Sequence, residues 1–188
     1  MTAKRARLYD TFAFFTALIV IGLDQWSKSL VVTHLGPPDF GPQVPLLGSY
    51  LSLSYTRNHG AAFRLFSSNG PVLFMLIAIA VVIIVYLYLR MRNTGPLLYK
   101  LSFGLIIGGA VGNNVLDRLI HGSVVDFIWF QIPQIGLNFA IFNLADAAIT
   151  LGVTLLFVTL IFRGKRGRGK PEGAHQLMAK EADHSPSV

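Results

Sequence analysis

The segment Phe12–Val32, FAFFTALIVIGLDQWSKSLVV, is apolar almost throughout but carries Asp24 and Lys28 within it. Its length matches the roughly 20 mostly apolar residues that a bilayer-spanning helix needs. Three further segments meet the same criterion, at residues 71–89, 97–114 and 141–162. The whole chain of 188 residues is 53% hydrophobic and only 13% charged, too little polar surface for a water-exposed globule. The sequence therefore predicts a mainly α-helical membrane protein with four transmembrane helices.

The distribution of basic residues predicts the orientation of these helices. Most of the 16 Lys and Arg residues precede the first span, separate the second from the third, or follow the fourth. The positive-inside rule assigns those segments to the cytoplasm, so both termini are cytoplasmic and the loops 33–70 and 115–140 face outward. Residues 163–188 are basic and nearly free of aromatic residues, which predicts a disordered cytoplasmic tail. The net charge of +7 is explained by topology and by membrane lipids as partners, so no nucleic acid is expected.

Each outer loop has a pattern of its own. Residues 51–55 alternate apolar with polar side chains, which is typical of a half-buried β-strand. The second loop is rich in Phe, Ile and Trp and is expected to lie against the membrane interface. The sequence thus predicts one domain over residues 1–162, in which the four spans are joined by a small β-containing outer region.

Polar side chains gather at one depth near the outer end of the predicted spans. With a rise of about 1.5 Å per residue, Asp24, Asn114 and Asp146 all fall within about 10 Å of the outer face. Asn143 lies just above Asp146, and Asp126 lies nearby in the second outer loop. Because a charged side chain in a bilayer costs at least about 2.5 kcal/mol, each of these needs a partner or a function.

A purely structural interpretation accounts for part of this set. Asp24 and Lys28 are one helical turn apart and predict an ion pair. Asp117 or Asp126 has a neighbour of opposite charge in Arg118. Asp146 has no basic residue within reach on its own helix, so a structural pairing explains it least well.

Two buried carboxylates brought together define a chemistry. Repulsion and desolvation raise the pKa of one member of such a pair, so that the pair holds a single proton at neutral pH. The ionised acid then takes a proton from water while its partner protonates a scissile carbonyl oxygen. Asp126 and Asp146 are the candidates, and this chemistry needs no metal or other cofactor.

Two other functions stay open at this point. His34, His59 and His121 lie in the predicted outer loops and offer ligands for a zinc protease, although no HExxH motif is present. A small proton- or cation-coupled transporter or channel subunit would also use intramembrane acids. The chain contains no cysteine, which excludes disulfides, thiolate metal sites and a cysteine nucleophile.

Four blocks of sequence, taken in order, resemble the lipoprotein signal peptidase (signal peptidase II) family of bacterial aspartic membrane proteases. They are Asp24–Lys28 (DQWSK), Asn58–Phe63 (NHGAAF), Asn114–Arg118 (NVLDR) leading to Val125–Phe127 (VDF), and Phe142–Asp146 (FNLAD). Together they cover about residues 12–162. In the third block Asn113 stands where the family usually has glycine, so Asn113 is the alternative to Asn114 as the functional asparagine.

The resemblance implies that Asp126 and Asp146 are the catalytic pair and that Asp24 is structural. Residues that match positions shaping the site or holding substrate are Asn58, Gly60, Asn114, Arg118 and Asn143. Lys28 and Asp117 are expected to be structural polar partners. The implied substrate is a prolipoprotein whose cysteine carries diacylglycerol. The implied enzyme is a monomer of the bacterial inner membrane, with its active site near the periplasmic face.

Overall fold

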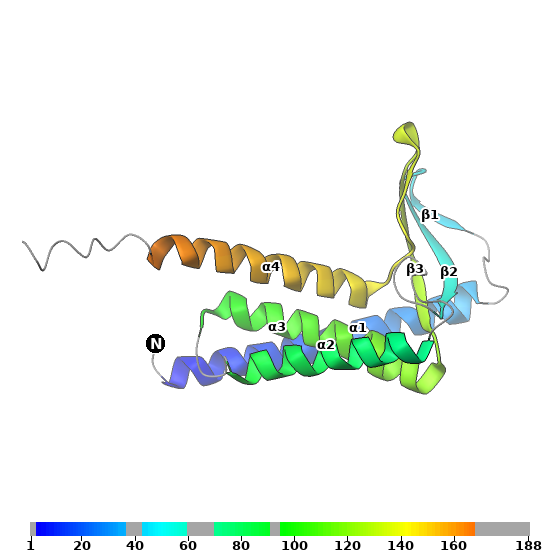
Figure 1. Cartoon of the computed structure of the whole chain (residues 1–188). Helices are drawn as coiled ribbons and strands as arrows, with labels where there is room; N and C mark the ends of the chain where they lie inside the picture. The colour runs from blue at the N-terminus through cyan, green and yellow to red at the C-terminus, as the bar shows by residue number, and fades with distance from the viewer. Residues whose placement is uncertain (1–2, 37–42, 60–69, 91–94, 168–188) are drawn as a thin grey trace, which may run out of the picture. The chain divides into compact units, whose positions relative to one another are not determined.

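The computed structural model describes residues 3–36, 43–59, 70–90 and 95–167. The chain divides into two compact units, Met1–Leu156 and Phe157–Val188, and the sheet and the site residues discussed below belong to the first. The described α-helices overlap the predicted spans without sharing all their bounds (Figure 1): α1 (Ala3–Leu35), α2 (Gly70–Arg90), α3 (Leu97–Ala110) and α4 (Leu144–Gly167).

Within the described residues, two helices are long and apolar enough to cross a membrane, Lys4–Leu35 and Leu144–Phe162, and Ile79–Arg90 is a shorter apolar helix. Large apolar side chains on them remain exposed, among them Trp26 at 62% and Val82 at 67%. Such surfaces suit a hydrocarbon environment rather than water.

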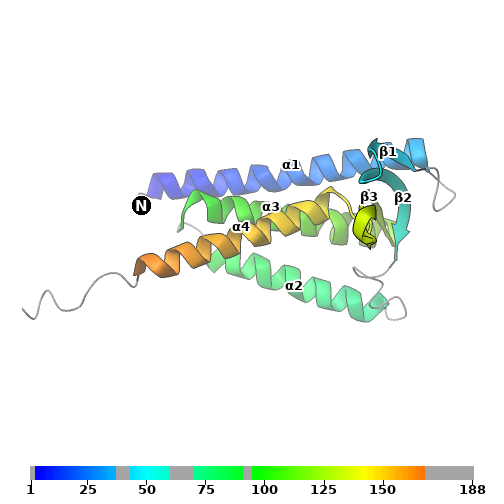
Figure 2. The same ribbon diagram turned by 90° about the horizontal axis from the view of Figure 1, so that it is seen from above.

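Glycines on α3 bring α1 and α4 close to it, and Figure 2 shows α1 and α3 side by side. A methyl group added at Gly108 would lie 2.8 Å from the carbonyl oxygen of Ala17 on α1. One added at Gly109 would lie 2.5 Å from the carbonyl oxygen of Ala145 at the start of α4. Small residues are therefore required on both faces of α3, as is usual where membrane helices pack closely.

The helix of the third predicted span does not end at Asn114. Beyond α3 the chain continues as a π-helix, η2 (Val111–His121), and stops at Gly122, whose φ of +72° is a left-handed conformation that favours glycine. π-helical turns are rare and occur mostly at functional sites. The polar residues of the third sequence block lie on this widened helix.

The two outer loops pair with each other in one antiparallel sheet of order β1-β2-β3-β4. Its strands are β1 (Val44–Leu47), β2 (Leu51–Asn58), β3 (Val124–Ile132) and β4 (Leu137–Asn138), and a 3-10 turn, η3 (Pro133–Ile135), precedes β4. The strand predicted at 51–55 is confirmed and runs three residues further. Between β2 and β3 the register shifts after Leu53, and Thr56 then stands opposite Asp126.

A small hydrophobic core fixes this sheet to the end of α1. Val31 of α1 is 6% exposed, Tyr55 of β2 is 1% exposed, and Phe127 of β3 is 5% exposed. Because Asp126 and Phe127 are consecutive in a strand, their side chains leave opposite faces of the sheet. Packing Phe127 against α1 thereby determines the direction in which Asp126 points.

Candidate active site

The amino-terminal end of α4 is capped by two of the predicted site residues. Asn143 Oδ1 accepts a hydrogen bond of 3.0 Å from the backbone N–H of Asp146, and Asp146 Oδ2 accepts one of 3.2 Å from the backbone N–H of Asn143. This reciprocal arrangement is a capping box, which satisfies two backbone donors that a helix start leaves without intrahelical partners. The side chains of Asn143 and Asp146 are thus held in one orientation by the helix itself.

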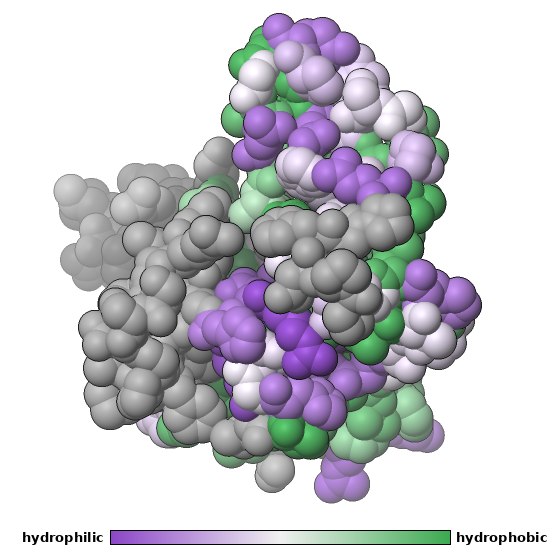
Figure 3. Space-filling view, turned by 90° about the vertical axis from the view of Figure 1, so that its right-hand side faces the viewer, coloured by the Kyte–Doolittle hydropathy of each residue, from purple (hydrophilic) through white to green (hydrophobic). Residues whose placement is uncertain are grey.

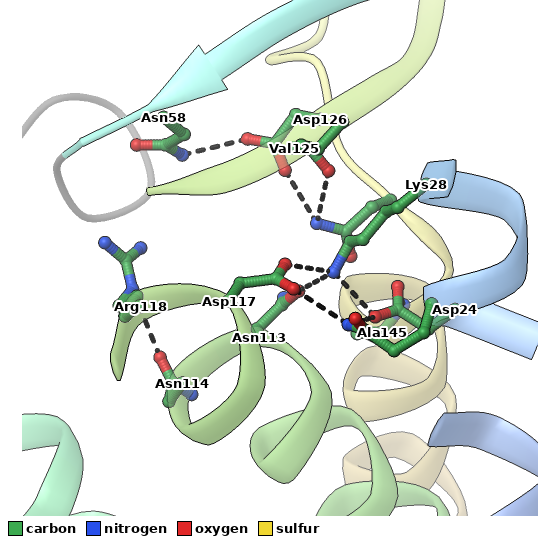
Figure 4. Close-up of polar contacts among 12 residues, drawn as sticks. Asp24, Lys28, Asn58, Asn113, Asn114, Asp117, Arg118, Val125, Asp126 and Ala145 are labelled. Atoms are coloured by element: carbon green, nitrogen blue, oxygen red, sulfur yellow. Dashed lines mark hydrogen bonds and ion pairs between the residues drawn. The ribbon is translucent and has the colours of Figure 1, made fainter. Parts of the chain in front are cut away.

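Asn143 also joins the two aspartates. Its Nδ2 donates a hydrogen bond of 2.6 Å to Asp126 Oδ1 and one of 3.3 Å to the carbonyl oxygen of Val125. The other oxygen of Asp126, Oδ2, accepts a bond of 2.9 Å from Asn58 Nδ2 on the neighbouring strand (Figure 4). One fully buried asparagine therefore contacts Asp126 through its side chain and Asp146 through its main chain and its carbonyl oxygen.

Burial controls the charge of Asp126, which is 3% exposed. Desolvation raises the pKa of this carboxyl from its ordinary 3.8 to about 6, and the charge of Asp146 acts in the same direction. The hydrogen bonds from Asn58 and Asn143 and the charge of Lys28 oppose this shift because they favour the carboxylate. Asp126 is consequently poised to change its protonation state close to neutral pH.

Lys28 is the centre of the polar network beneath this pair. Its Nζ lies 2.6 Å from each of three acceptors on α1 and η2: Asp24 Oδ2, Asn113 Oδ1 and Asp117 Oδ2. An ammonium group has three hydrogens to donate, so these bonds use all of them. The other oxygen of Asp24 accepts a bond of 3.0 Å from the backbone N–H of Ala145 and so links α1 to the start of α4.

The asparagine that reaches the aspartates is Asn113. Its Nδ2 donates a hydrogen bond of 2.7 Å to Asp146 Oδ1, whereas Asn114 Oδ1 accepts a bond of 3.3 Å from Arg118 Nε. Asn114 was chosen because it keeps the three-residue step to Asp117, and its role toward substrate stays a prediction. Asn113 and Asp117 are four residues apart on η2, and both reach Lys28.

The remaining predicted site residues differ in their contacts with the aspartate pair. Arg118 interacts electrostatically with Asp126 and Asp146. Gly60 lies outside the described residues. His34 faces the carbonyl oxygen of Leu30 on its own helix, at 2.8 Å. In the described part of the chain, no three His, Asp or Glu side chains gather in a way that would hold a metal ion.

A cavity of about 370 Å³ lies beside the Lys28 network, not at the aspartate pair. Its lining includes Gln25, Lys28, Asp117, His121 and Ser123, and neither Asp126 nor Asp146 belongs to it. Hydrophilic side chains, purple in Figure 3, gather in the middle of the face viewed from the end that carries the sheet.

The sequence patterns did not indicate Gln25 as a site residue, although it stands next to Asp24 in an apolar span. Its side chain donates a hydrogen bond of 2.8 Å to Asp117.

Apolar helices of membrane-crossing length, a small antiparallel sheet, and a buried and a half-buried aspartate joined by one asparagine are the features of a membrane enzyme. Comparison with known proteins agrees, since residues 16–162 match the signal peptidase (SPase) II family. The chain therefore belongs to the signal peptidase II family and is a peptidase. These matches give no support to the transporter alternative.

Individual relatives extend over most of the chain. It is 39% identical over 161 residues to a lipoprotein signal peptidase of Halalkalibacterium halodurans, covering 86% of this chain and 98% of that one. It is 44% identical over 153 residues to a lipoprotein signal peptidase of Mesorhizobium japonicum, covering 80% and 87%. A bacterial membrane enzyme structure determined by the in meso method at 2.3 Å resolution superposes with a TM-score of 0.73 at 28% identity, covering 86% of this chain and 94% of that one.

Proposed function

We propose that this protein is an aspartic endopeptidase that removes signal peptides from diacylglyceryl-modified prolipoproteins, with Asp126 and Asp146 as its catalytic pair. The observation that carries the proposal is the double role of Asn143, which contacts Asp126 Oδ1 and caps α4 together with Asp146. This asparagine holds the two carboxyl groups in a fixed relation, and such preorganisation is what general acid–base catalysis requires.

The reaction follows from two carboxyl groups that share one proton. The ionised member takes a proton from a water molecule, which attacks the scissile carbonyl carbon. The protonated member donates its proton to the carbonyl oxygen, so a neutral tetrahedral intermediate forms. The carbon–nitrogen bond then breaks as the proton taken from water passes to the leaving amine. The protein's own side chains suffice for every step.

The proposed topology has four transmembrane helices, both termini in the cytoplasm and the sheet at the outer face of the bacterial inner membrane. The basic residues that flank the predicted spans support this orientation. Asp24, Asp126 and Asp146 are then close to the outer surface, where a lipid-linked cysteine would lie. The tail predicted to be disordered from residue 163 is instead helical as far as Gly167, the end of α4, and residues 168–188 lie outside the described part of the chain. We propose that membrane lipids surround a monomer.

A diacylglyceryl-modified substrate presents a signal-peptide helix and two acyl chains, so its site must open sideways toward the bilayer. Exposed apolar side chains on the helices, such as Leu23 and Tyr86, supply surfaces of matching character. We propose that β2 forms part of a cradle for the substrate and that Asn58, Gly60, Arg118 and Asn143 shape its inner wall. The apolar loop that contains β3 serves as the lid that limits access of water.

The test is cleavage of a diacylglyceryl-modified prolipoprotein by purified protein in detergent, with and without a strong chelator. Asp126→Asn and Asp146→Asn are each expected to lower turnover by at least about 100-fold in protein that still folds, because each removes a proton-transfer group without changing its size. Asp183→Asn in the tail is the matched control and should retain wild-type turnover. Chelator-sensitive cleavage, or no cleavage by folded wild type, would contradict the proposal.

A further inference from the structure

The carboxyl group of Asp146 is held from two directions. Its Oδ2 accepts the backbone N–H of Asn143 at 3.2 Å, a bond that belongs to the cap of α4. Its Oδ1 accepts a shorter bond of 2.7 Å from Nδ2 of Asn113, which lies on η2 and is 33 positions away in the sequence. Of these two donors only Asn113 is a side chain, so it is the residue whose loss would release one oxygen of Asp146.

The direction of the Asn113 amide is determined by Lys28. The oxygen and nitrogen ends of an amide group are nearly equal in shape, so its partners decide which way it faces. Asn113 Oδ1 lies 2.6 Å from Lys28 Nζ (Figure 4), and an ammonium group can only donate hydrogen bonds. The NH2 group of Asn113 must therefore face Asp146. Asn113 is 5% exposed, which leaves little water to offer it another partner.

Lys28 is in turn held in place by two carboxylates. Its Nζ lies 2.6 Å from Asp24 Oδ2 and 2.6 Å from Asp117 Oδ2, and its side chain is 5% exposed. Charge-assisted bonds of this kind are roughly twice as strong as neutral ones, so the ammonium group stays where its third hydrogen reaches Asn113. The orientation of Asp146 thus depends on a series of contacts that begins at these two acids and passes through Lys28 and Asn113.

We propose that Asn113 is a positioning residue of the peptidase reaction and that Lys28 acts on the active site through it. The two residues hold the carboxyl group of Asp146 in one orientation and touch no substrate. The proposal rests on the proposed function and adds these two residues to its machinery.

The fixed amide acts in both protonation states of Asp146. When Asp146 is ionised, the donors from Asn113 and Asn143 each use one lone pair, and the remaining lone pairs are left for water. When Asp146 carries a proton, that proton cannot point at either neighbour, because both neighbours are donors. If Asn113 were free to turn, its carbonyl oxygen could accept this proton and withhold it from the reaction. Lys28 prevents that turn.

A merely structural role of Asn113 predicts a different result. Asn113 joins α1 to α4 through η2, so its loss should cost stability in any case. A side chain that only joins helices would change the unfolding temperature and leave kcat of the folded enzyme unaltered. A positioning residue should instead lower kcat more than it changes KM, because the substrate does not contact it.

The experiment compares kcat and KM of Asn113→Leu with those of Lys100→Met in the cleavage assay, on protein shown to be folded. Leucine has a similar branched shape but makes no hydrogen bond, so kcat should fall by about 10- to 100-fold while KM changes by less than about twofold. Lys100→Met removes a buried contact with Asp10 at the other end of α3 and should lower stability without lowering kcat. An unchanged kcat in Asn113→Leu would overturn the proposal while the proposed function stands.

The role of Lys28 is tested by combining two variants. If Lys28 acts through Asn113, kcat of the double variant Lys28→Met with Asn113→Leu should be no lower than that of the worse single variant. Losses that multiply would mean that Lys28 reaches the site by another route, which overturns its part in the proposal. The comparison of Asn113→Leu with Lys100→Met does not require Lys28→Met to fold.

A second measurement needs no substrate. In ¹⁵N NMR of asparagine-labelled protein, the side-chain NH2 signal of Asn113 is identified by its loss in Asn113→Leu. This signal should move in Asp146→Asn and in Lys28→Met, since each substitution removes one partner of the amide. A signal that stays in place in either folded variant would overturn the proposal. If the wild-type protein cleaves no prolipoprotein, the proposed function fails, and this signal still decides whether Lys28 orients Asn113 toward Asp146.

Discussion

Replacing Lys28 by methionine tests the network that supports the site. The substitution keeps a long unbranched side chain and removes one positive charge. It leaves Asp24 and Asp117 without their cation, and these side chains are 0% and 4% exposed. Neither carboxylate gains enough contact with water to be hydrated in its place.

The size of the effect follows from this burial. Removing one partner of a buried ion pair costs about 3–5 kcal/mol, because an uncompensated charge stays inside. Lys28 has two such partners, so we expect the upper half of that range. For a domain of this size, such a loss lowers the unfolding temperature by about 8–20 °C.

Lys100→Met is the matched comparison within the same chain. The side chain of Lys100 is 1% exposed and its Nζ lies 2.7 Å from Asp10 Oδ1, but Asp10 keeps 17% exposure. A partly hydrated carboxylate tolerates the loss of its cation better, so we expect a cost of about 1–3 kcal/mol. The assay is equilibrium unfolding in detergent micelles, followed by tryptophan fluorescence.

One outcome of this comparison would contradict the role given to Lys28. If Lys28→Met destabilised the protein no more than Lys100→Met, the network around Lys28 would not be the buried and fully bonded centre described above. The double variant Lys28→Met with Asp117→Asn provides a check, since it removes one of the two carboxylates that Lys28→Met leaves without a cation. It should recover part of the stability that Lys28→Met loses.

Two further predictions concern stability at and near the site. The pKa of Asp126 is about 6 in the folded state and about 3.8 in the unfolded state. The free energy of unfolding should therefore fall by about 3 kcal/mol as the pH rises through this interval, because the unfolded state loses its proton first. Asp126→Asn should remove this contribution. A flat profile in wild type would contradict the burial of Asp126. Gly112→Ala should lower the unfolding temperature, since its methyl group would lie 2.9 Å from Asp24 Oδ2, whereas Gly22→Ala meets nothing within 4 Å and should not.

Much of the fold was predictable because it depends on local patterns. Apolar runs predicted where the described α-helices lie, and strict alternation predicted the strand around 51–55. The pairing of Asp24 with Lys28 was also predictable, since positions one turn apart face each other on any helix. Each of these features is determined by residues close together in the sequence.

Contacts between distant segments were not predictable in the same way. No local pattern shows that Lys28 also reaches Asn113 and Asp117, which are 85 and 89 positions away. Nor does any local pattern show that Asn113 bonds to Asp146, 33 positions further on, or that the segment around Asn113 is a π-helix. Backbone departures of this kind depend on packing against neighbouring helices, which single-sequence periodicity does not report.

Helix capping and the candidate active site use the same atoms. The start of α4 needs acceptors for its first backbone N–H groups, and two of them are Asp24 Oδ1, which receives Ala145, and Asn143 Oδ1, which receives Asp146. The acid on α1 thus determines where α4 begins and where Asp146 lies along it. Asn143, once fixed as the cap, has only its NH2 group left to offer Asp126. The geometry of the pair is therefore a consequence of docking α4 on α1, which explains why polar residues far from each other in the sequence collect at this one helix end.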